Sequence, residues 1–165
     1  MSIPLVTIIG KSGCGKTTLI EKLVVELKSR NYKLATIKHH SHRGFDIDQP
    51  GKDSWRFAQA GSDHVIIASP DKIASYRKIE HEFSLDEIAA GILDVDLILA
   101  EGYKQAEKPS LEVVRAAHSR EIIGSTAQRF AVAADFPLDL GVPLFGLDDV
   151  QTIAEFIENR FIKQS

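Results

Sequence analysis

The chain has 165 residues, a formal net charge of −3, 44% hydrophobic and 26% charged residues, which is ordinary composition for a soluble globular protein. This length predicts a single domain over residues 1–165 with a substantial core. The slightly acidic charge balance argues against a protein that coats nucleic acid, and no apolar stretch approaches the length that spans a membrane.

The first predicted elements surround a glycine-rich motif. Residues 3–9 form an apolar run typical of a buried parallel strand. Residues 17–28 place apolar side chains on one face of a predicted helix. Between them, residues 10–17 read GKSGCGKT and match the phosphate-loop pattern G-x-x-x-x-G-K-[ST] at every fixed position. The order of strand, loop and helix is the one that a polyphosphate-binding loop requires.

This motif predicts specific chemistry for its residues. The glycines allow the backbone to wrap closely around a polyphosphate and to turn several N–H groups inward. In such loops the lysine, here Lys16, reaches the β- and γ-phosphates, and the hydroxyl of Thr17 ligates Mg²⁺. We therefore predict catalytic roles for Lys16 and Thr17. The predicted nucleotide contacts are Gly10, Lys11, Ser12, Gly13, Cys14, Gly15, Lys16, Thr17 and Thr18.

Two residues of the loop have a second interpretation. Cys14 is the only cysteine, so no disulfide can form within the chain, and a small residue filling a variable loop position is preferred over a redox group. A lone thiol, together with an N-terminus that lacks the features of a signal peptide, predicts a cytoplasmic protein. Lys11 is either an exposed loop lysine or a contact to the nucleotide of a partner subunit in a dimer.

Strand and helix patterns alternate along the rest of the chain. They predict an α/β fold of the P-loop NTPase type, with a mostly parallel sheet flanked by helices. Further strands are expected at residues 33–38, 64–69, 73–79, 95–100, 110–116 and 130–134. Helices are expected at residues 53–60 and 84–93, and from residue 148 or 149 to about residue 161. The charged run at 73–79 is expected at a sheet edge.

A carboxylate beside the loop is needed to complete a Mg²⁺ site. Glu101 stands where the apolar run of residues 97–100 stops, and ligands of open α/β sheets bind at the carboxyl ends of strands. We therefore predict Glu101 as a metal ligand and catalytic residue. Asp96 is the rival, but it falls at the start of this strand, at the opposite edge of the sheet.

The polar loop at residues 38–54 leaves the same edge of the sheet and has the features of a switch loop. Asp46 and Asp48 are candidate metal ligands, with Asp48 preferred, and Lys52 is a candidate phosphate or substrate contact. Three histidines of this loop form an alternative transition-metal site, although no cysteine accompanies them and their spacing meets no established pattern. They are His39, His40 and His42.

Recognition of the base is weakly specified. The guanine-reading signature [NT]-K-x-D is absent, and the nearest substitute is Asp135 at the end of the predicted strand 130–134. Asp135 is a candidate acceptor for the N1 and amino hydrogens of guanine. A turn aspartate before Pro137 is an equally good interpretation.

Several motifs together resemble the MobB family, the molybdopterin-guanine dinucleotide biosynthesis adapter proteins. They are SGCGKTT at 12–18, IKHH at 37–40, DIDQPGKDS at 46–54, AG at 60–61, DLILAEGYK at 96–104 and AVAAD at 131–135. The resemblance implies a P-loop fold, GTP binding, a dimer and weak GTPase activity. It also implies a role in assisting a separate, MobA-like molybdopterin guanylyltransferase and other molybdenum cofactor proteins. Residues 48–53 and Arg115 become candidate site residues, whereas Ser62 and Lys11 depart from the family pattern.

The residues also allow two other functions. A small-molecule kinase needs arginines on a lid, and Arg115, Arg120 and Arg129 are available, but residues 104–129 read as strand and loop rather than a helical lid. A metal-insertion GTPase would carry its metal on the three histidines. The preferred prediction is a GTP-binding adapter that hydrolyses GTP slowly, if at all.

Overall fold

The computed structural model describes residues 3–42 and 44–164. These residues form two compact units. The first contains the described chain up to residue 39 and again from residue 85 onward, and the second contains the described part of 40–84. No helix of the described chain is both long enough and apolar enough to cross a bilayer.

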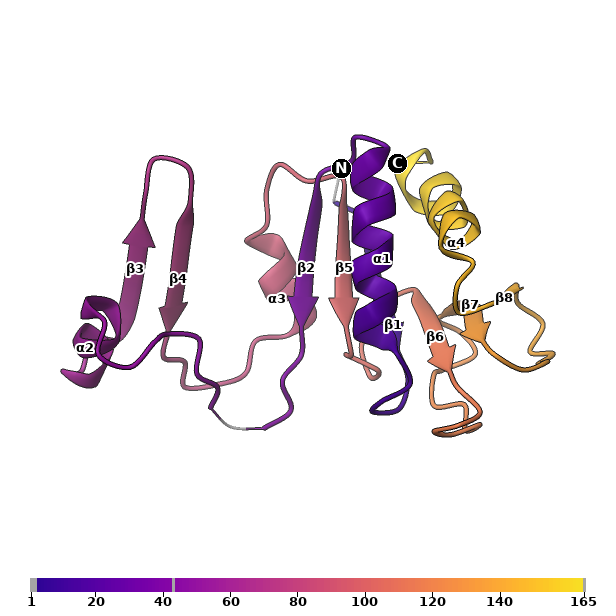
Figure 1. Ribbon diagram of the computed structural model, residues 1–165, viewed down its shortest axis with the longest axis horizontal. Coiled ribbons are helices and arrows are strands. Elements are labelled where there is room, and N and C mark those ends of the chain that lie inside the picture. Colours follow the sequence, from indigo (N-terminus) through magenta and orange to yellow (C-terminus); the bar gives the residue numbers. More distant parts are fainter. Residues whose placement is uncertain (1–2, 43, 165) are drawn as a thin grey trace. The chain divides into compact units, whose positions relative to one another are not determined.

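The first unit is built on a six-stranded sheet in which all neighbouring strands are parallel (Figure 1). The strand order is β2-β5-β1-β6-β7-β8. The bounds are Leu5–Ile9 for β1, Leu34–Lys38 for β2, Leu97–Glu101 for β5, Ser110–Val114 for β6, Arg129–Ala134 for β7 and Leu144–Phe145 for β8. The P-loop type of α/β fold is thereby confirmed. The strand β8 was not predicted, because two residues carry no periodic pattern.

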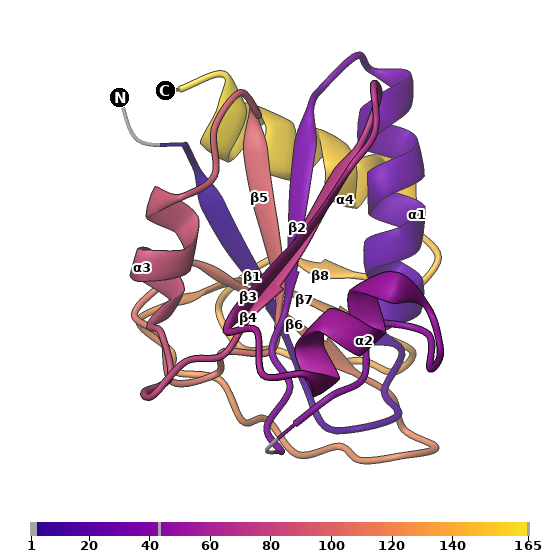
Figure 2. The same cartoon turned by 90° about the vertical axis from the view of Figure 1, so that its left-hand side faces the viewer.

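Alternation along the strands divides the core between two faces of the sheet. Val6 of β1 packs in a cluster with α1 (Lys16–Ser29) and α4 (Val150–Ile157), whereas its neighbour Leu5 packs with Leu85 of α3 (Leu85–Ala90). Figure 2 shows α1 and α3 on opposite sides of the sheet. The last helix continues as a π-helical segment, η1 (Glu158–Ile162). Ile153 and Ile157 of α4 are fully buried.

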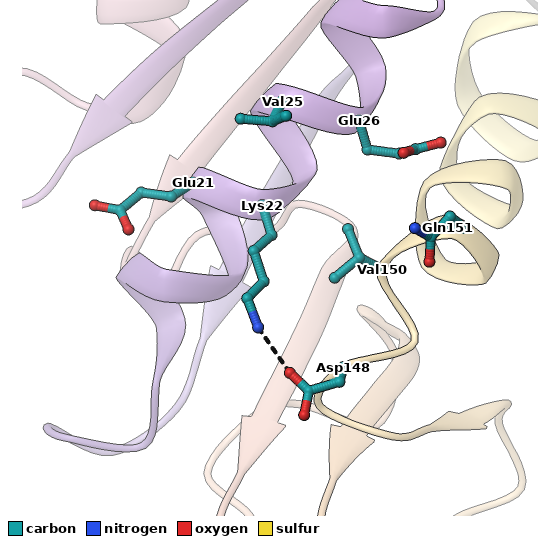
Figure 3. A pocket seen from close by; sticks show the side chains of 7 residues that line it. All are labelled: Glu21, Lys22, Val25, Glu26, Asp148, Val150 and Gln151. Carbon is teal, nitrogen blue, oxygen red and sulfur yellow. Dashed lines mark hydrogen bonds and ion pairs between the residues drawn. The ribbon is translucent and has the colours of Figure 1, made fainter.

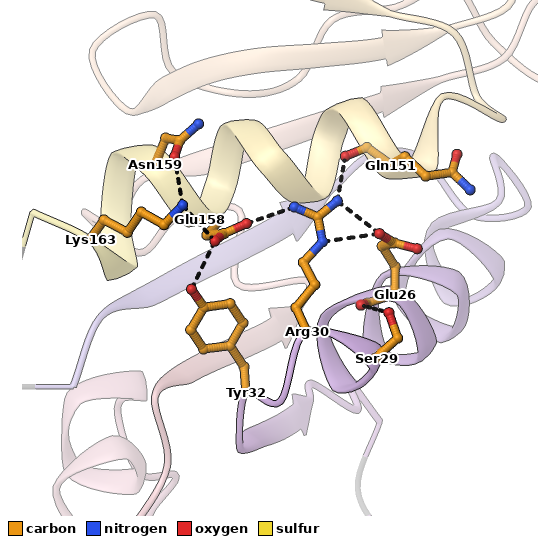
Figure 4. Close-up of polar contacts among 8 residues, drawn as sticks. All are labelled: Glu26, Ser29, Arg30, Tyr32, Gln151, Glu158, Asn159 and Lys163. Carbon is orange, nitrogen blue, oxygen red and sulfur yellow. Dashed lines mark hydrogen bonds and ion pairs between the residues drawn. The ribbon is translucent and has the colours of Figure 1, made fainter.

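A polar network joins the C-terminal end of α1 to α4 and η1 (Figure 4). Its centre is the carboxylate of Glu158, which accepts hydrogen bonds from Arg30 at 2.6 Å and Tyr32 at 2.9 Å. Lys163 forms an ion pair with the same carboxylate at 2.8 Å. Hydrogen bonds from Lys163, Arg30 and Tyr32 lower the pKa of Glu158 to about 2. Arg30 also contacts Glu26 at 2.8 Å, so its charge is shared between two helices.

The second unit contains α2 (Asp53–Gln59) and a hairpin of β3 (His64–Ala68) and β4 (Ile73–Arg77). The strand expected at residues 73–79 does lie at a sheet edge, but β3 and β4 form their own antiparallel sheet and do not join the parallel one. A connection as short as residues 69–72 permits only antiparallel pairing. Ser69 closes the turn by accepting a hydrogen bond from the amide of Lys72 at 3.0 Å.

Candidate phosphate-binding site

The phosphate loop joins the end of β1 to the start of α1. Gly10 has a φ of 145°, and a Cβ atom placed there would lie 2.3 Å from the carbonyl oxygen of Val113 and 2.7 Å from Sγ of Cys14. Any other residue at position 10 would therefore displace either β6 or the loop itself. Gly15 precedes the helix in the left-handed region, with a φ of 100°. The loop conformation thus depends on these two glycines.

The N-terminal end of α1 lacks the usual means of satisfying its amides. Within the described chain, no side chain caps the helix at Gly15, and the first turn carries no acidic residue. Free N–H groups and the positive end of the helix dipole make such a terminus suited to an anion. Thr17 and Thr18 are exposed there, as are Ser12 and Gly13 in the preceding loop.

Lys16 is held inside the loop. Its ammonium group donates hydrogen bonds to the carbonyl oxygens of Gly10 at 3.0 Å and Lys11 at 2.8 Å. Cys14 is 1% exposed, and its Sγ lies 3.9 Å from the ammonium nitrogen. This burial agrees with the prediction that Cys14 fills space. The lysine contacts the loop rather than the hydrophobic core, so its charge is available to a ligand at the loop.

Thr17 and Glu101 meet beside the loop, as the sequence predicted. The Thr17 hydroxyl donates a hydrogen bond to Oε2 of Glu101 at 2.9 Å, and Nζ of Lys38 lies 3.8 Å from Oε1. The strands β1 and β5 bring them together, because Ile8 pairs with Glu101 in parallel register. A hydroxyl and a carboxylate are oxygen ligands of the kind that Mg²⁺ accepts, with water and phosphate oxygens in its other positions. The pair therefore fits the predicted metal.

Asp96, the rival carboxylate, has a different role. It lies before β5, at the opposite end of that strand from Glu101. Its Oδ2 accepts a hydrogen bond from the amide of Lys33 at 2.7 Å, and its own amide donates to the Lys33 carbonyl at 2.8 Å. Asp96 thus fixes the entry to β2 next to β5.

Residues 115–128, which we call the β6–β7 connection, form a second boundary of the site. Nη2 of Arg115 lies 3.5 Å from the Cβ position of Gly15, and the imidazole of His118 lies 3.1 Å from that of Gly13. The sequence motifs did not indicate His118. Its position depends on β6 pairing with β1, and no local pattern reports such a long-range contact.

Residues of the β6–β7 connection also contact Lys11 and Asp135. Lys11 forms an ion pair with Glu121 at 2.8 Å, with both side chains well exposed. Asp135 follows β7, and its Oδ1 accepts a hydrogen bond from the amide of Ala116 at 2.8 Å. Asp135 therefore stabilises the backbone just after β6 through a long-range contact rather than a local turn, and its side chain remains exposed to solvent.

Asp48 and Lys52 belong to the second unit. Asp48 accepts hydrogen bonds from the Tyr76 hydroxyl and from the Gln49 amide, both at 2.8 Å. Hydrogen bonding from Ser54 first, and from Tyr76 and Gln49, lowers the pKa of Asp48. Lys52 is exposed at the N-cap position of α2. Their predicted contacts with metal and phosphate remain predictions.

The alternatives gain no support from the structure. Residues 104–129, all of them described, contain β6 and loops but no helix, so they provide no helical lid for a kinase. The rings of His40 and His42 lie 5.8 Å apart, and the ring of His39 lies tilted against that of Tyr103, with 4.7 Å between their centroids. Among the described residues, no three His, Cys, Asp or Glu side chains are grouped so that they can hold a metal.

A separate hollow of about 470 Å³ lies between α1 and the start of α4 (Figure 3). At one end of it, Lys22 forms an ion pair with Asp148 at 2.7 Å. The residues that line it are Glu21, Lys22, Val25, Glu26, Asp148, Val150 and Gln151. No residue of the phosphate loop is among them, so this hollow is distinct from the candidate phosphate site.

Comparisons with known proteins agree with this geometry. The family model for molybdopterin guanine dinucleotide synthesis protein B matches residues 5–135. The molybdopterin-guanine dinucleotide biosynthesis adapter proteins of Haemophilus influenzae and Escherichia coli are 39% and 37% identical to the chain, over 95% and 99% of its length and 89% and 96% of theirs. A crystal structure of molybdopterin-guanine biosynthesis protein B superimposes with a TM-score of 0.74 at 34% identity, covering 94% of this chain and 98% of that one.

Proposed function

The chain belongs to the MobB family, and on this premise we propose that it is a GTP-binding adapter protein that assists the guanylation of molybdopterin. The observation that carries the nucleotide-binding part is the Thr17–Glu101 hydrogen bond of 2.9 Å beside an uncapped helix N-terminus. A hydroxyl and a carboxylate in this position match the metal side of a P-loop site. The adapter role is proposed from the similarity to relatives that are described as adapter proteins of molybdopterin-guanine dinucleotide biosynthesis.

In the proposed complex, backbone amides between residues 10 and 18 and the Lys16 ammonium hold the triphosphate. Thr17 and Glu101 would hold Mg²⁺, which neutralises negative charge on the phosphates when it is bound. Asp48 is proposed as a further metal ligand and Lys52 as a phosphate or substrate contact. Asp135 is proposed to contact guanine through its exposed carboxylate.

We propose that hydrolysis of GTP is slow. One Glu101 oxygen accepts from Thr17 and the other faces Lys38, so this carboxylate serves as a ligand rather than as a base for water. Lys16, Thr17 and Glu101 would then act by stabilising charge. Positioning of the attacking water contributes orders of magnitude in fast GTPases, and no residue of the sequence plainly takes the part of a water-positioning switch glutamine.

The proposed partners follow from the family. They are a second copy of this chain, a MobA-like molybdopterin guanylyltransferase and other proteins of molybdenum cofactor synthesis. We place these interactions in the cytoplasm, where the single thiol, Cys14, stays reduced.

Calorimetric titration of the purified protein with GTP and with ATP, each with Mg²⁺, tests the nucleotide part. We expect GTP to bind more tightly than ATP. Equal or tighter binding of ATP would contradict the proposal. The adapter part is tested by mixing the tagged chain with a purified guanylyltransferase and measuring formation of the dinucleotide cofactor, which should increase when the chain and GTP are both present.

A further inference from the structure

We propose that the β6–β7 connection supplies a second cationic contact to the phosphates of the nucleotide, through the guanidinium group of Arg115. This inference rests on the proposed function, because it gives a defined role at the same polyphosphate site to Arg115, which the family resemblance marked only as a candidate site residue. It concerns the phosphates alone and is independent of which base the site accepts.

The topology places Arg115 at the phosphate loop. Arg115 follows β6 directly, and β6 runs parallel to β1 with Ile9 paired to Glu112. The two strands therefore end at the same edge of the sheet, where ligands of this fold class bind. The guanidinium lies against Gly15, with Nη2 and Cζ at 3.5 and 3.8 Å from the Cβ position of that glycine. A positive group thus lies next to the uncapped start of α1.

The guanidinium has an unused hydrogen-bond donor. Within the described chain, Nε of Arg115 is buried and has no hydrogen-bond partner. Asp148 lies near enough for the charge of Arg115 to lower its pKa, but the larger causes are its hydrogen bond and charge interaction with Lys22. A buried donor without an acceptor is rare in a folded protein and calls for an explanation. Phosphate oxygens are acceptors that guanidinium groups bind strongly.

Buried contacts fix the backbone that carries Arg115. Glu112 is completely buried and accepts hydrogen bonds from the amide of Ile123 at 2.6 Å and from Nε of Arg129 at 2.9 Å. At the start of the connection, the amides of His118 and Ser119 both donate to the carbonyl of Arg115 at 2.9 Å. The backbone that carries Arg115 is therefore fixed beside the loop before any ligand binds, which reduces the entropy lost on binding.

The chain offers a matched control in the same connection. The guanidinium of Arg120 lies 4.9 Å from the ring centroid of Phe136, and its side chain is exposed. Arg120→Ala removes one positive charge from the same segment without removing a group that lies against the phosphate loop. A comparison of the two arginines therefore separates a specific phosphate contact from a general effect of net charge.

The test is calorimetric titration of the full chain with GTP and with inorganic tripolyphosphate, each in Mg²⁺. We expect Arg115→Ala to weaken the binding of both ligands at least tenfold, and Arg115→Lys to weaken it less, because a positive charge remains. Arg120→Ala should change both affinities less than twofold. Thermal unfolding of each variant without ligand verifies that the fold is retained. If the alanine variant does not fold, the affinities of Arg115→Lys are compared with those of Arg120→Ala instead.

The outcomes are distinguishable. If the natural chain binds GTP and Arg115→Ala binds it equally well, the role of Arg115 is overturned while the proposed function survives. Equal losses in the Arg115→Ala and Arg120→Ala variants also overturn it, because they would reflect net charge alone. If the natural chain binds neither GTP nor tripolyphosphate, the proposed function itself fails, and this inference fails with it.

Discussion

The two ends of helix α1 differ in how their polar groups are satisfied. At the C-terminal end, Arg30 is paired with Glu26 and Glu158, and Glu158 is also bonded to Tyr32 and Lys163. At the N-terminal end, no described side chain caps the helix, and Lys16 contacts only atoms of its own loop. The same helix thus has one end built for stability and one end with donors available to a ligand.

The contrast also separates the roles of two carboxylates. Glu158 has three cationic or hydroxyl partners within 2.9 Å, and this binding lowers its pKa to about 2. Glu101 has one short hydrogen bond, from Thr17, and a looser contact with Lys38 at 3.8 Å. A carboxylate with fewer partners is better placed to accept a metal ion. Changes at one end of α1 should therefore affect binding, and changes at the other should affect stability.

The largest expected effect on binding comes from Lys16→Ala. Because a hydrogen-bonded charge contributes about 1.5–3 kcal/mol and Lys16 is expected to make several such contacts, GTP affinity should fall about 100-fold or more. The fold should be retained, since Lys16 contacts the loop rather than the strands and helices of the core. Titration calorimetry measures the affinity. Lys28→Ala, an exposed lysine in the last turn of the same helix, is the control and should bind GTP normally.

At the other end, Glu158→Gln should lower the free energy of unfolding by about 1–3 kcal/mol, because it weakens charged hydrogen bonds to Arg30 and Lys163. GTP affinity should remain that of the natural chain. Chemical denaturation provides the first quantity and calorimetry the second. Glu155→Gln, on the exposed side of α4, serves as the control. A variant that keeps full stability but loses GTP binding would reverse the assignment of the two helix ends.

The ion pairs of Glu158 also predict that the stability of the fold depends on pH. Glu158 has a pKa of about 2 in the folded protein and an ordinary value of 4.5. Its charge therefore stabilises the fold fully above pH 4.5, and this contribution is lost as the pH falls from 4.5 towards 2. The stability difference between the natural chain and Glu158→Gln should accordingly be smaller at pH 3 than at pH 7. Because Lys163 is exposed, solvent screening weakens its ion pair with Glu158 and limits the size of this stability difference. An equal difference at both pH values would rule out this linkage.

An intermediate effect is expected from Glu101→Gln. The amide retains the size of the side chain but removes the charge that attracts Mg²⁺, so GTP affinity with Mg²⁺ should fall about tenfold. Affinity measured with a chelator and no Mg²⁺ should change much less. Titrations under both conditions make the comparison. Asp96→Asn, at the opposite end of β5, should leave the effect of Mg²⁺ unchanged.

The smallest effect is expected from Lys11→Ala. The ion pair between Lys11 and Glu121 is exposed, so its loss should cost at most about 1 kcal/mol of stability. Denaturation in low and high salt measures this contribution, which should shrink as salt is added. A large loss of GTP binding accompanied by a change in oligomeric state would favour the alternative that Lys11 contacts the nucleotide of a partner subunit.

The sequence predicted the parts of the site that depend on local patterns. The glycine motif specifies the loop and Thr17, and the carboxyl end of a second apolar run marks Glu101, although their contact depends on β5 pairing with β1. The contact of His118 with Gly13 required knowledge that β6 lies next to β1. The separate hairpin was missed because apolar residues in short strands do not reveal which sheet they join; Ile66 and Ile73 are exposed in it.

The central claim is that the backbone between residues 10 and 18 holds the triphosphate. A crystal structure with Mg²⁺ and a non-hydrolysable GTP analogue is the most direct test. We predict phosphate oxygens within hydrogen-bond distance of the loop amides and Lys16, and a metal ion ligated on the side of Thr17 and Glu101. An analogue bound elsewhere on the chain, with only water in the loop, would contradict the account.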